Sequence, residues 1–170
     1  MPAPAERHIP DPGFAGDTGA VAPEVSAALA AYDAGRADHA DTLAVLQDAR
    51  LLVPVVAVLG EVEYDEAGLA HDKSSDMAAV LLTGADGRLA LLAFTGTETL
   101  QRWNPEARPV PVATRLAAQA AVQDQAAALV IDVAGPVRFV IEGEDLQGLA
   151  AGWSLARVGE RAAWIRPAAD

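Results

Sequence analysis

Apolar residues gather in short runs separated by turn-forming residues, and two of these runs predict a β-hairpin. Residues 77–83 and 88–95 are rich in aliphatic side chains and flank Gly-Ala-Asp-Gly at 84–87. The Asp-Gly pair tolerates the positive φ values that tight antiparallel turns require. Residues 51–59 are continuously apolar and rich in valine, which predicts a strand covered on both faces. Pro54 cannot donate a ladder hydrogen bond, so we expect it near the strand start or where it has no neighbour.

Further strands are predicted in the second half of the chain. Residues 128–133 and 137–142 are apolar and flank Ala-Gly-Pro at 134–136. This turn sequence allows the second strand to return antiparallel to the first. Residues 110–112 predict another short strand.

Two helices are predicted ahead of the first strand. Pro23 suits the first turn of a helix, and apolar side chains then recur at spacings of four and three on one face. They are Val25, Leu29 and Tyr32. Gly35 ends this helix, and either Asp38 or Asp41 can cap a second one. The apolar residues of the second helix are Leu43 and Leu46.

A short capped helix is predicted directly after the hairpin. Thr97 is placed to cap a helix that carries Glu98 in its first turn and Trp103 near its end. Residues 114–125 and 145–149 predict two more helices. The narrow apolar face of the first of these would be formed by Leu116, Ala120 and Ala127.

The two ends of the chain differ from the middle. Residues 1–22 contain several prolines without apolar periodicity, which predicts a mobile extension or a strap on the surface. In the alternative, Ile9 and Phe14 dock into a groove, since isolated large apolar side chains need a contact. Residues 23–150 are expected to form one domain. Residues 151–170 are too apolar for simple disorder, and we expect them to pack on or beside that domain.

Composition and charge argue against several functions. A net charge of −12 repels the phosphate groups of nucleic acids and of anionic membranes. No apolar run reaches the roughly 18 residues needed to span a bilayer. The N-terminus lacks the pattern of a secretory signal, so a cytoplasmic location is expected. The absence of cysteine excludes disulfides and thiolate chemistry.

Several segments match a known family in order and spacing. They are the two front helices ahead of the strand at 51–55, Ala-Phe-Thr-Gly-Thr-Glu at 93–98, Ala-Leu-Val-Ile-Asp-Val-Ala-Gly-Pro at 128–136, and Glu-Gly-Glu-Asp-Leu at 142–146. Over about residues 25–149 the chain resembles the N-terminal domain of the SseB family. The resemblance implies an α+β fold: a single domain with a mixed, largely antiparallel sheet of about five strands and flanking helices. It carries no catalytic signature, and the residues after Leu149 are too few for the second domain of longer members.

A search for catalytic and ligand-binding motifs finds none with the required spacing. His8, His39 and His71 lie in different segments and lack the i, i+4 spacing of a helical metal site. No nucleophile elbow, phosphate-binding loop or dinucleotide motif is present. The best metal candidate is the acidic loop at 61–76, but it lacks the residue order of a calcium loop. We therefore expect no catalytic residue, cofactor or metal site.

Asp132 stands among aliphatic residues of a predicted strand. A functional carboxylate is one interpretation of this position. We expect instead that Asp132 lies on the exposed face of the strand or pairs with Arg138 across the hairpin.

Two functions stay open. Aromatic residues are favoured at binding hot spots, which suggests a non-enzymatic protein-interaction or adaptor domain with a protein partner, or a homodimer formed through strand edges. The candidate interaction surface comprises Thr97, Glu98, Trp103, Trp153 and Trp164. For the first three, the structural alternative is a capped helix with a core tryptophan. The second function is a small-ligand or metal-responsive sensor that uses the acidic loop.

Overall fold

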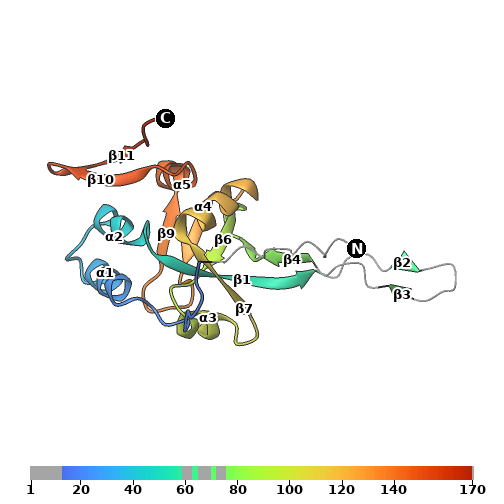
Figure 1. Cartoon of the computed structure of the whole chain (residues 1–170). Helices are drawn as coiled ribbons and strands as arrows, with labels where there is room; N and C mark the ends of the chain where they lie inside the picture. The colour runs from blue at the N-terminus through green and yellow to red at the C-terminus, as the bar shows by residue number, and fades with distance from the viewer. Residues whose placement is uncertain (1–12, 59–62, 65–69, 72–75, 170) are drawn as a thin grey trace, which may run out of the picture.

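The computed structural model describes residues 13–58, 63–64, 70–71 and 76–169, and it shows helices packed against two joined sheets (Figure 1). The helices are α1 (Pro23–Asp33), α2 (His39–Leu46), α3 (Thr97–Trp103), α4 (Thr114–Gln123) and α5 (Gly143–Ala150). The strands of the two main sheets are β1 (Arg50–Val58), β4 (Asp76–Ala79), β5 (Leu81–Thr83), β6 (Leu89–Ala93), β7 (Arg108–Ala113), β8 (Ala128–Ile131) and β9 (Phe139–Glu142). Two small hairpins consist of β2 (Glu63–Tyr64) with β3 (Ala70–His71), and β10 (Ser154–Val158) with β11 (Arg161–Ile165). The predicted α+β fold is confirmed.

The larger sheet has the strand order β5-β6-β8-β9 and is mixed. The pairs β5–β6 and β8–β9 are antiparallel, as their turn sequences predicted. Between them, β6 and β8 run parallel, with Leu91 opposite Leu129. The carboxyl ends of these two strands therefore lie at the same edge of the sheet.

The smaller sheet, of order β4-β1-β7, corrects the extent of the first predicted hairpin. Residues up to Ala79 belong to β4 and pair with β1, and only residues from Leu81 onward pair with β6. Val80 lies at the change of partner. Its amide donates to the carbonyl of Pro54 at 3.3 Å, and its carbonyl accepts from the amide of Leu92 at 3.2 Å. The continuous extended segment at 76–83 therefore contributes β4 to the smaller sheet and β5 to the larger one.

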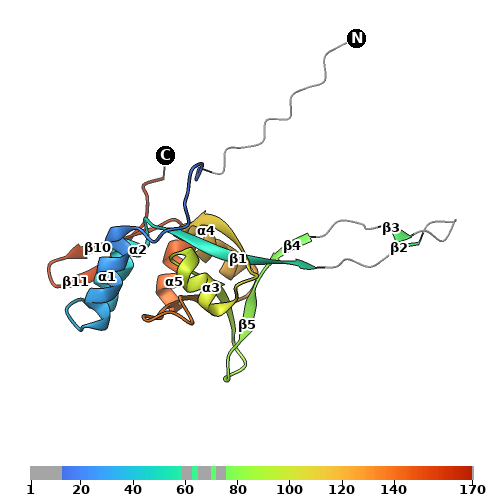
Figure 2. The ribbon, with the colours of Figure 1, turned by 90° about the horizontal axis from the view of Figure 1, so that it is seen from below.

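The two sheets are joined where β1 passes the end of β6. Leu52 and Phe94 exchange two backbone hydrogen bonds of 2.7 and 2.8 Å. Pro54 lies opposite Pro109 of β7, so neither residue has an amide hydrogen to leave unpaired there. Beyond this point β1 and β4 extend from the body of the domain as a two-stranded arm (Figure 2).

Side chains alternate between two cores on the two faces of the larger sheet. Leu91 and Ala93 point into the main core, which α1, α2, α4 and α5 cover, whereas Leu92 and Phe94 point into a smaller core beneath α3. In the part of the chain that the structure describes, no helix has the length and apolar character required to cross a membrane.

The structure confirms the predicted cap of α2, but the predicted apolar face of α4 is wrong. The Asp38 carboxylate accepts from the amide of Asp41, and the Asp41 carboxylate accepts from the amide of Asp38, which forms a complete capping box for α2. In α4, Leu116 is 57% exposed. The buried residues of this helix are Thr114, Ala117, Ala118 and Ala121. Both the amide and the hydroxyl of Thr114 donate to the carbonyl of Ala49, and this junction fixes the rotation of α4 so that its small residues face the core.

Candidate functional site

Asp132 is a buried carboxylate at the end of β8. It is 2% exposed and has a φ of 54°, a left-handed conformation that aspartate adopts more readily than most residues. The expectation that it lies on an exposed strand face or pairs with Arg138 is wrong. The regular strand ends at Ile131, and the left-handed turn that follows places the Asp132 side chain inside the protein, while Arg138 is exposed.

Three hydrogen bonds connect this carboxylate to the end of β6 and the first turn of α3. Oδ1 accepts from the amide of Thr95 at 2.9 Å and from the hydroxyl of Thr99 at 2.6 Å. Oδ2 accepts from the hydroxyl of Thr95 at 2.6 Å. Sequence reasoning missed both threonines as partners of Asp132, because the bonds span 37 and 33 residues and depend on the parallel pairing of β6 with β8.

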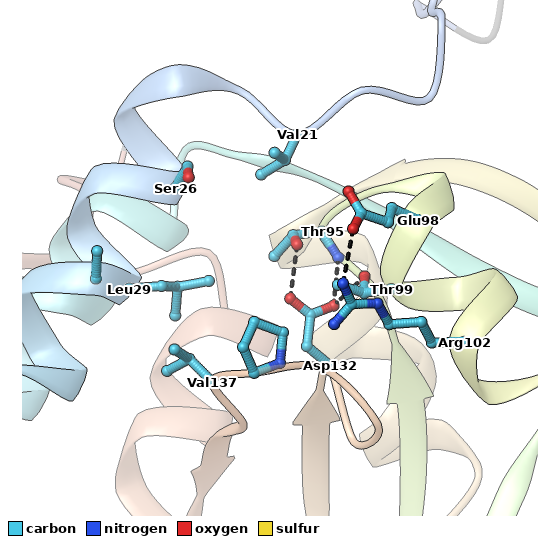
Figure 3. A pocket seen from close by; sticks show the side chains of 11 residues that line it. Val21, Ser26, Leu29, Thr95, Glu98, Thr99, Arg102, Asp132 and Val137 are labelled. Carbon is cyan, nitrogen blue, oxygen red and sulfur yellow. Dashed lines mark hydrogen bonds and ion pairs between the residues drawn. The ribbon is translucent and has the colours of Figure 1, made fainter.

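A pocket of about 230 Å³ lies beside this network (Figure 3). Three segments that are distant in sequence line it: α1 with the residue Val21 just before it, the end of β6 with α3, and the loop after β8. The apolar lining residues include Val21, Leu29 and Val137. Glu98 and Arg102, which also line it, form an exposed ion pair of 2.8 Å. The pocket thus combines apolar walls with a buried carboxylate and a paired set of charges.

Residues 13–22 form a strap across the start of α3. Arg50 holds the strap, with its Nε 2.6 Å from a carboxylate oxygen of Asp17, and it also donates to the carbonyl of Thr95 at 2.8 Å. The Arg50 and Asp17 side chains are only 15% and 16% exposed. The expected strap is therefore present in this stretch, and Phe14 is half-buried there. Residues 1–12, including Ile9, lie outside the described residues.

The strap also explains why Thr97 is the first residue of α3 and not its cap, as we had predicted. The N-cap is Gly96, which has no side chain to accept a hydrogen bond. A β-carbon at Gly96 would lie 3.1 Å from both the carbonyl oxygen of Gly19 and the amide nitrogen of Val21. The Gly19 carbonyl instead accepts from the amide of Thr97 at 2.7 Å, so the strap supplies an acceptor that a capping side chain would otherwise provide.

The five residues of the candidate interaction surface fall into two groups. Thr97, Glu98 and Trp103 lie on α3, where the half-buried Trp103 packs on Phe94 with ring centroids 5.6 Å apart. Trp153 and Trp164 lie at the C-terminal hairpin, on the other side of the domain (Figure 1). The structure does not bring the two groups together.

The inner face of the C-terminal hairpin, β10–β11, is fastened to the domain by Trp164. The indole donates to a carboxylate oxygen of Asp145 at 2.9 Å. The ring lies so close to α5 that a β-carbon at Gly148 would be 2.7 Å from it. Leu155, opposite Trp164 in the hairpin, is buried in the main core.

Polar contacts attach the same hairpin to α2. Gln47 donates to the carbonyl of Leu155 at 3.1 Å and accepts from its amide at 2.8 Å. Arg157 forms ion pairs of 2.8 Å with Asp38 and 2.7 Å with Asp41. The backbone amide of Asp41 and then Arg157 hold the pKa of Asp38 below its ordinary value. The hydrogen bonds that Arg157 donates to these two carboxylates raise the pKa of Arg157.

His39 and the acidic loop were two further candidates in the sequence. His39 stacks on Phe139 with ring centroids 4.6 Å apart, and its Nε2 lies 3.2 Å from Asp145. Of the acidic loop at 61–76, the structure describes the backbone of β2, β3 and the start of β4, and the rest lies outside the described residues. Its role as a ligand or metal sensor stays a prediction. Elsewhere in the described chain, no group of three potential metal ligands occurs.

Comparison with known families adds to this geometry. The family model described as the SseB protein N-terminal domain matches residues 25–148 of the chain. The chain belongs to the SseB family. The comparisons with curated proteins and with solved structures gave no match. The matched span contains Asp132 with both of its threonine partners, whereas the hairpin β10–β11 lies beyond its end.

Proposed function

We propose that the chain is a cytosolic, non-enzymatic protein-interaction domain that binds an extended segment of a protein partner at the edge of β11. In this proposal, residues 151–170 are an appendage of the domain at 23–150 that serves as its binding element. The observation that carries the proposal is the open edge of β11, which has only β10 as a strand neighbour in the described part of the chain.

The edges of β7 and β5 are less suited to pairing. Strand β7 carries prolines at 109 and 111, and proline cannot donate to an added strand. Strand β5 has only three residues. Strand β11 has five residues and no proline, so its backbone can accept a neighbouring strand.

The hydrogen bonds of β10 indicate which groups of β11 are open. The amide and carbonyl of Leu155 both bond to Gln47 and therefore point away from β11. Leu155 and Trp164 must form a non-hydrogen-bonded pair, and because such pairs alternate along an antiparallel ladder, Arg157 and Ala162 form the next one. The backbone amides and carbonyls of Ala162 and Trp164 consequently point to the open edge.

The outer face of the hairpin offers apolar contacts beside this edge. Val158 is 64% exposed and Ile165 is 51% exposed. Both side chains lie on the outer face of the hairpin. The side chains of Leu155 and Trp164 lie on the opposite face and pack on the domain. Main-chain hydrogen bonds would supply affinity, and these side chains would supply selectivity.

A pair of substitutions at one position tests the proposal. Ala162→Pro removes an outward amide and obstructs the edge, whereas Ala162→Ser keeps the amide and serves as the control. The full chain would be crosslinked in native cytosol, and its partners would be recovered and identified by mass spectrometry. We expect the wild type and Ala162→Ser to recover the same stoichiometric partner, and Ala162→Pro to lose most of it.

Folding and self-association need separate measurements. Protection of the Ala163 amide from hydrogen exchange would show that the hairpin persists in the proline variant. Light scattering would show whether the partner is a second copy, since the wild type would then be a dimer and Ala162→Pro a monomer. Equal recovery by a folded Ala162→Pro variant, or no specific partner for the wild type, would contradict the proposal.

A further inference from the structure

We infer that the pocket beside Asp132 binds a small organic cation, in which an ammonium group is joined to a short apolar part. This inference does not rest on the proposed protein partner, because α3 and the C-terminal hairpin lie on different sides of the domain (Figure 1). It concerns a ligand site made by the SseB domain together with Val21 of the strap.

The charge of the pocket favours a cation. Glu98 and Arg102 pair with each other at 2.8 Å, which leaves the Asp132 carboxylate as the unbalanced charge of the lining. Asp132 accepts hydrogen bonds from an amide and two hydroxyls, all neutral groups, and it forms no ion pair with any residue that the structure describes. Buried charges are normally paired, and an ammonium group would supply the missing partner.

The carboxylate also has capacity for another donor. Its two oxygens offer about four lone-pair sites, and the threonines use three of them, two on Oδ1 and one on Oδ2. The remaining site, on Oδ2, is available for a donor from the pocket, which Asp132 lines (Figure 3). An ammonium group would therefore add to the existing network without displacing a threonine.

The walls and the volume define the rest of the ligand. Val21, Leu29 and Val137 present aliphatic side chains to the pocket, so the part of the ligand away from the ammonium group should be apolar. A cavity of about 150 Å³ holds a ring of six carbon atoms, so a pocket of this size takes about nine non-hydrogen atoms. The ligand is thus a small amine and not a nucleotide or a peptide.

The position of the pocket supports a ligand site. It lies at the carboxyl ends of the parallel strands β6 and β8, the edge at which open α/β sheets generally bind ligands. The left-handed conformation of Asp132, with its φ of 54°, brings the carboxylate to this edge. The rim residues Ser26, Glu98 and Arg102 are exposed, so a ligand can enter from solvent.

Three probes of similar size and different charge test the inference. Benzylammonium, benzyl alcohol and benzoate would each be titrated into the full chain while the backbone amides of Thr95, Gly96 and Thr99 are followed by NMR. We expect saturable shifts at these amides with benzylammonium, and affinity at least about tenfold weaker for the neutral and anionic probes. Equal binding of benzyl alcohol or benzoate would overturn the assignment of a cation site.

Two variants locate the binding. Asp132→Asn removes the charge, and Ser26→Trp fills the pocket from the exposed face of α1 without replacing Asp132 or either threonine. Each should weaken benzylammonium binding by at least about tenfold. If Asp132→Asn does not fold, Ser26→Trp decides the question. Unchanged affinity in the folded Ser26→Trp variant would place the probe elsewhere and overturn the inference.

Discussion

The Asp132 network and the C-terminal hairpin both depend on contacts between residues far apart in sequence, but they differ in burial. Asp132 is 2% exposed and bonds to Thr95, which is also buried. The hairpin is held partly by the ion pairs of Arg157, whose side chain is 42% exposed. We therefore expect the first region to open only when the whole domain unfolds, and the second to open locally.

The two regions also lie on different sides of the end of the family match. The Asp132 network joins strands and a helix inside the matched residues 25–148, whereas β10 and β11 lie after them. A buried network contributes to the stability of the whole domain, because its loss leaves polar groups without partners. If the hairpin is an appendage, as we propose, its contacts stabilise mainly its own attachment, and local opening exposes it without global unfolding.

The largest expected effect follows loss of the buried carboxylate. Asp132→Ala leaves the amide and the hydroxyl of Thr95 without their acceptor, while the Thr99 hydroxyl can still donate to the carbonyl of Gly96 at 3.1 Å. Each unsatisfied buried group costs about 1–3 kcal/mol. We expect the free energy of unfolding in urea to fall by about 3 kcal/mol or more. Asp132→Asn keeps a side-chain acceptor and tolerates the left-handed conformation, so its free energy of unfolding should fall less than that of Asp132→Ala. Wild-type stability of Asp132→Ala would show that the network is dispensable.

A smaller and more local effect is expected at the hairpin. Trp164→Ala removes the ring that packs on Gly148 and the hydrogen bond to Asp145, which together should cost about 1–2 kcal/mol for a half-buried side chain. Hydrogen exchange should accelerate in β10 and β11, and the hydrogen-bonded amides of these strands should exchange faster than the Thr95 amide, because the hairpin opens before the domain unfolds. Trp164→Phe retains a ring without the hydrogen-bond donor, so its stability should lie between those of the wild type and Trp164→Ala. Equal protection of the Thr95 amide and the hydrogen-bonded amides of β10 and β11 would mean that the hairpin and domain unfold as one unit.

The smallest expected effect is a loosening of the hairpin in acid. The pKa of Asp38 is lowered in the folded protein, so its interactions favour folding above the ordinary pKa of 3.8 and are lost as the pH falls below it. The effect is small because Asp38 is exposed and its ion pair is screened by solvent. The melting temperatures of the wild type and Asp38→Asn should differ at pH 5 and converge at pH 3. A difference of the same size at both pH values would assign the stabilisation to something other than the charge of Asp38.

The sequence predicted those features whose causes are local. The cap of α2 could be narrowed to Asp38 or Asp41 because capping involves residues three positions apart. The turn at 84–87 was predictable because its own residues determine its conformation.

Features that depend on tertiary contacts were missed or mistaken. Asp132 was placed on an exposed face because nothing near it in sequence indicates that Thr95 and Thr99 will surround it. Gly96 replaces Thr97 as the cap of α3 because the strap arrives from residues 13–22. The buried face of α4 was misjudged because alanine gives a weak apolar pattern and Leu116 is exposed.

Residue-resolved hydrogen exchange of the wild-type chain tests most directly whether a stable domain carries a hairpin with an open edge. At a concentration where the chain is monomeric, the Thr95 amide, which bonds to buried Asp132, should exchange only through global unfolding. Along β11, the Ala163 amide should be protected by β10, and the amides of Ala162 and Trp164 should exchange rapidly. Protection of Ala162 and Trp164 equal to that of Ala163 would contradict the account, because it would mean that the edge is already covered.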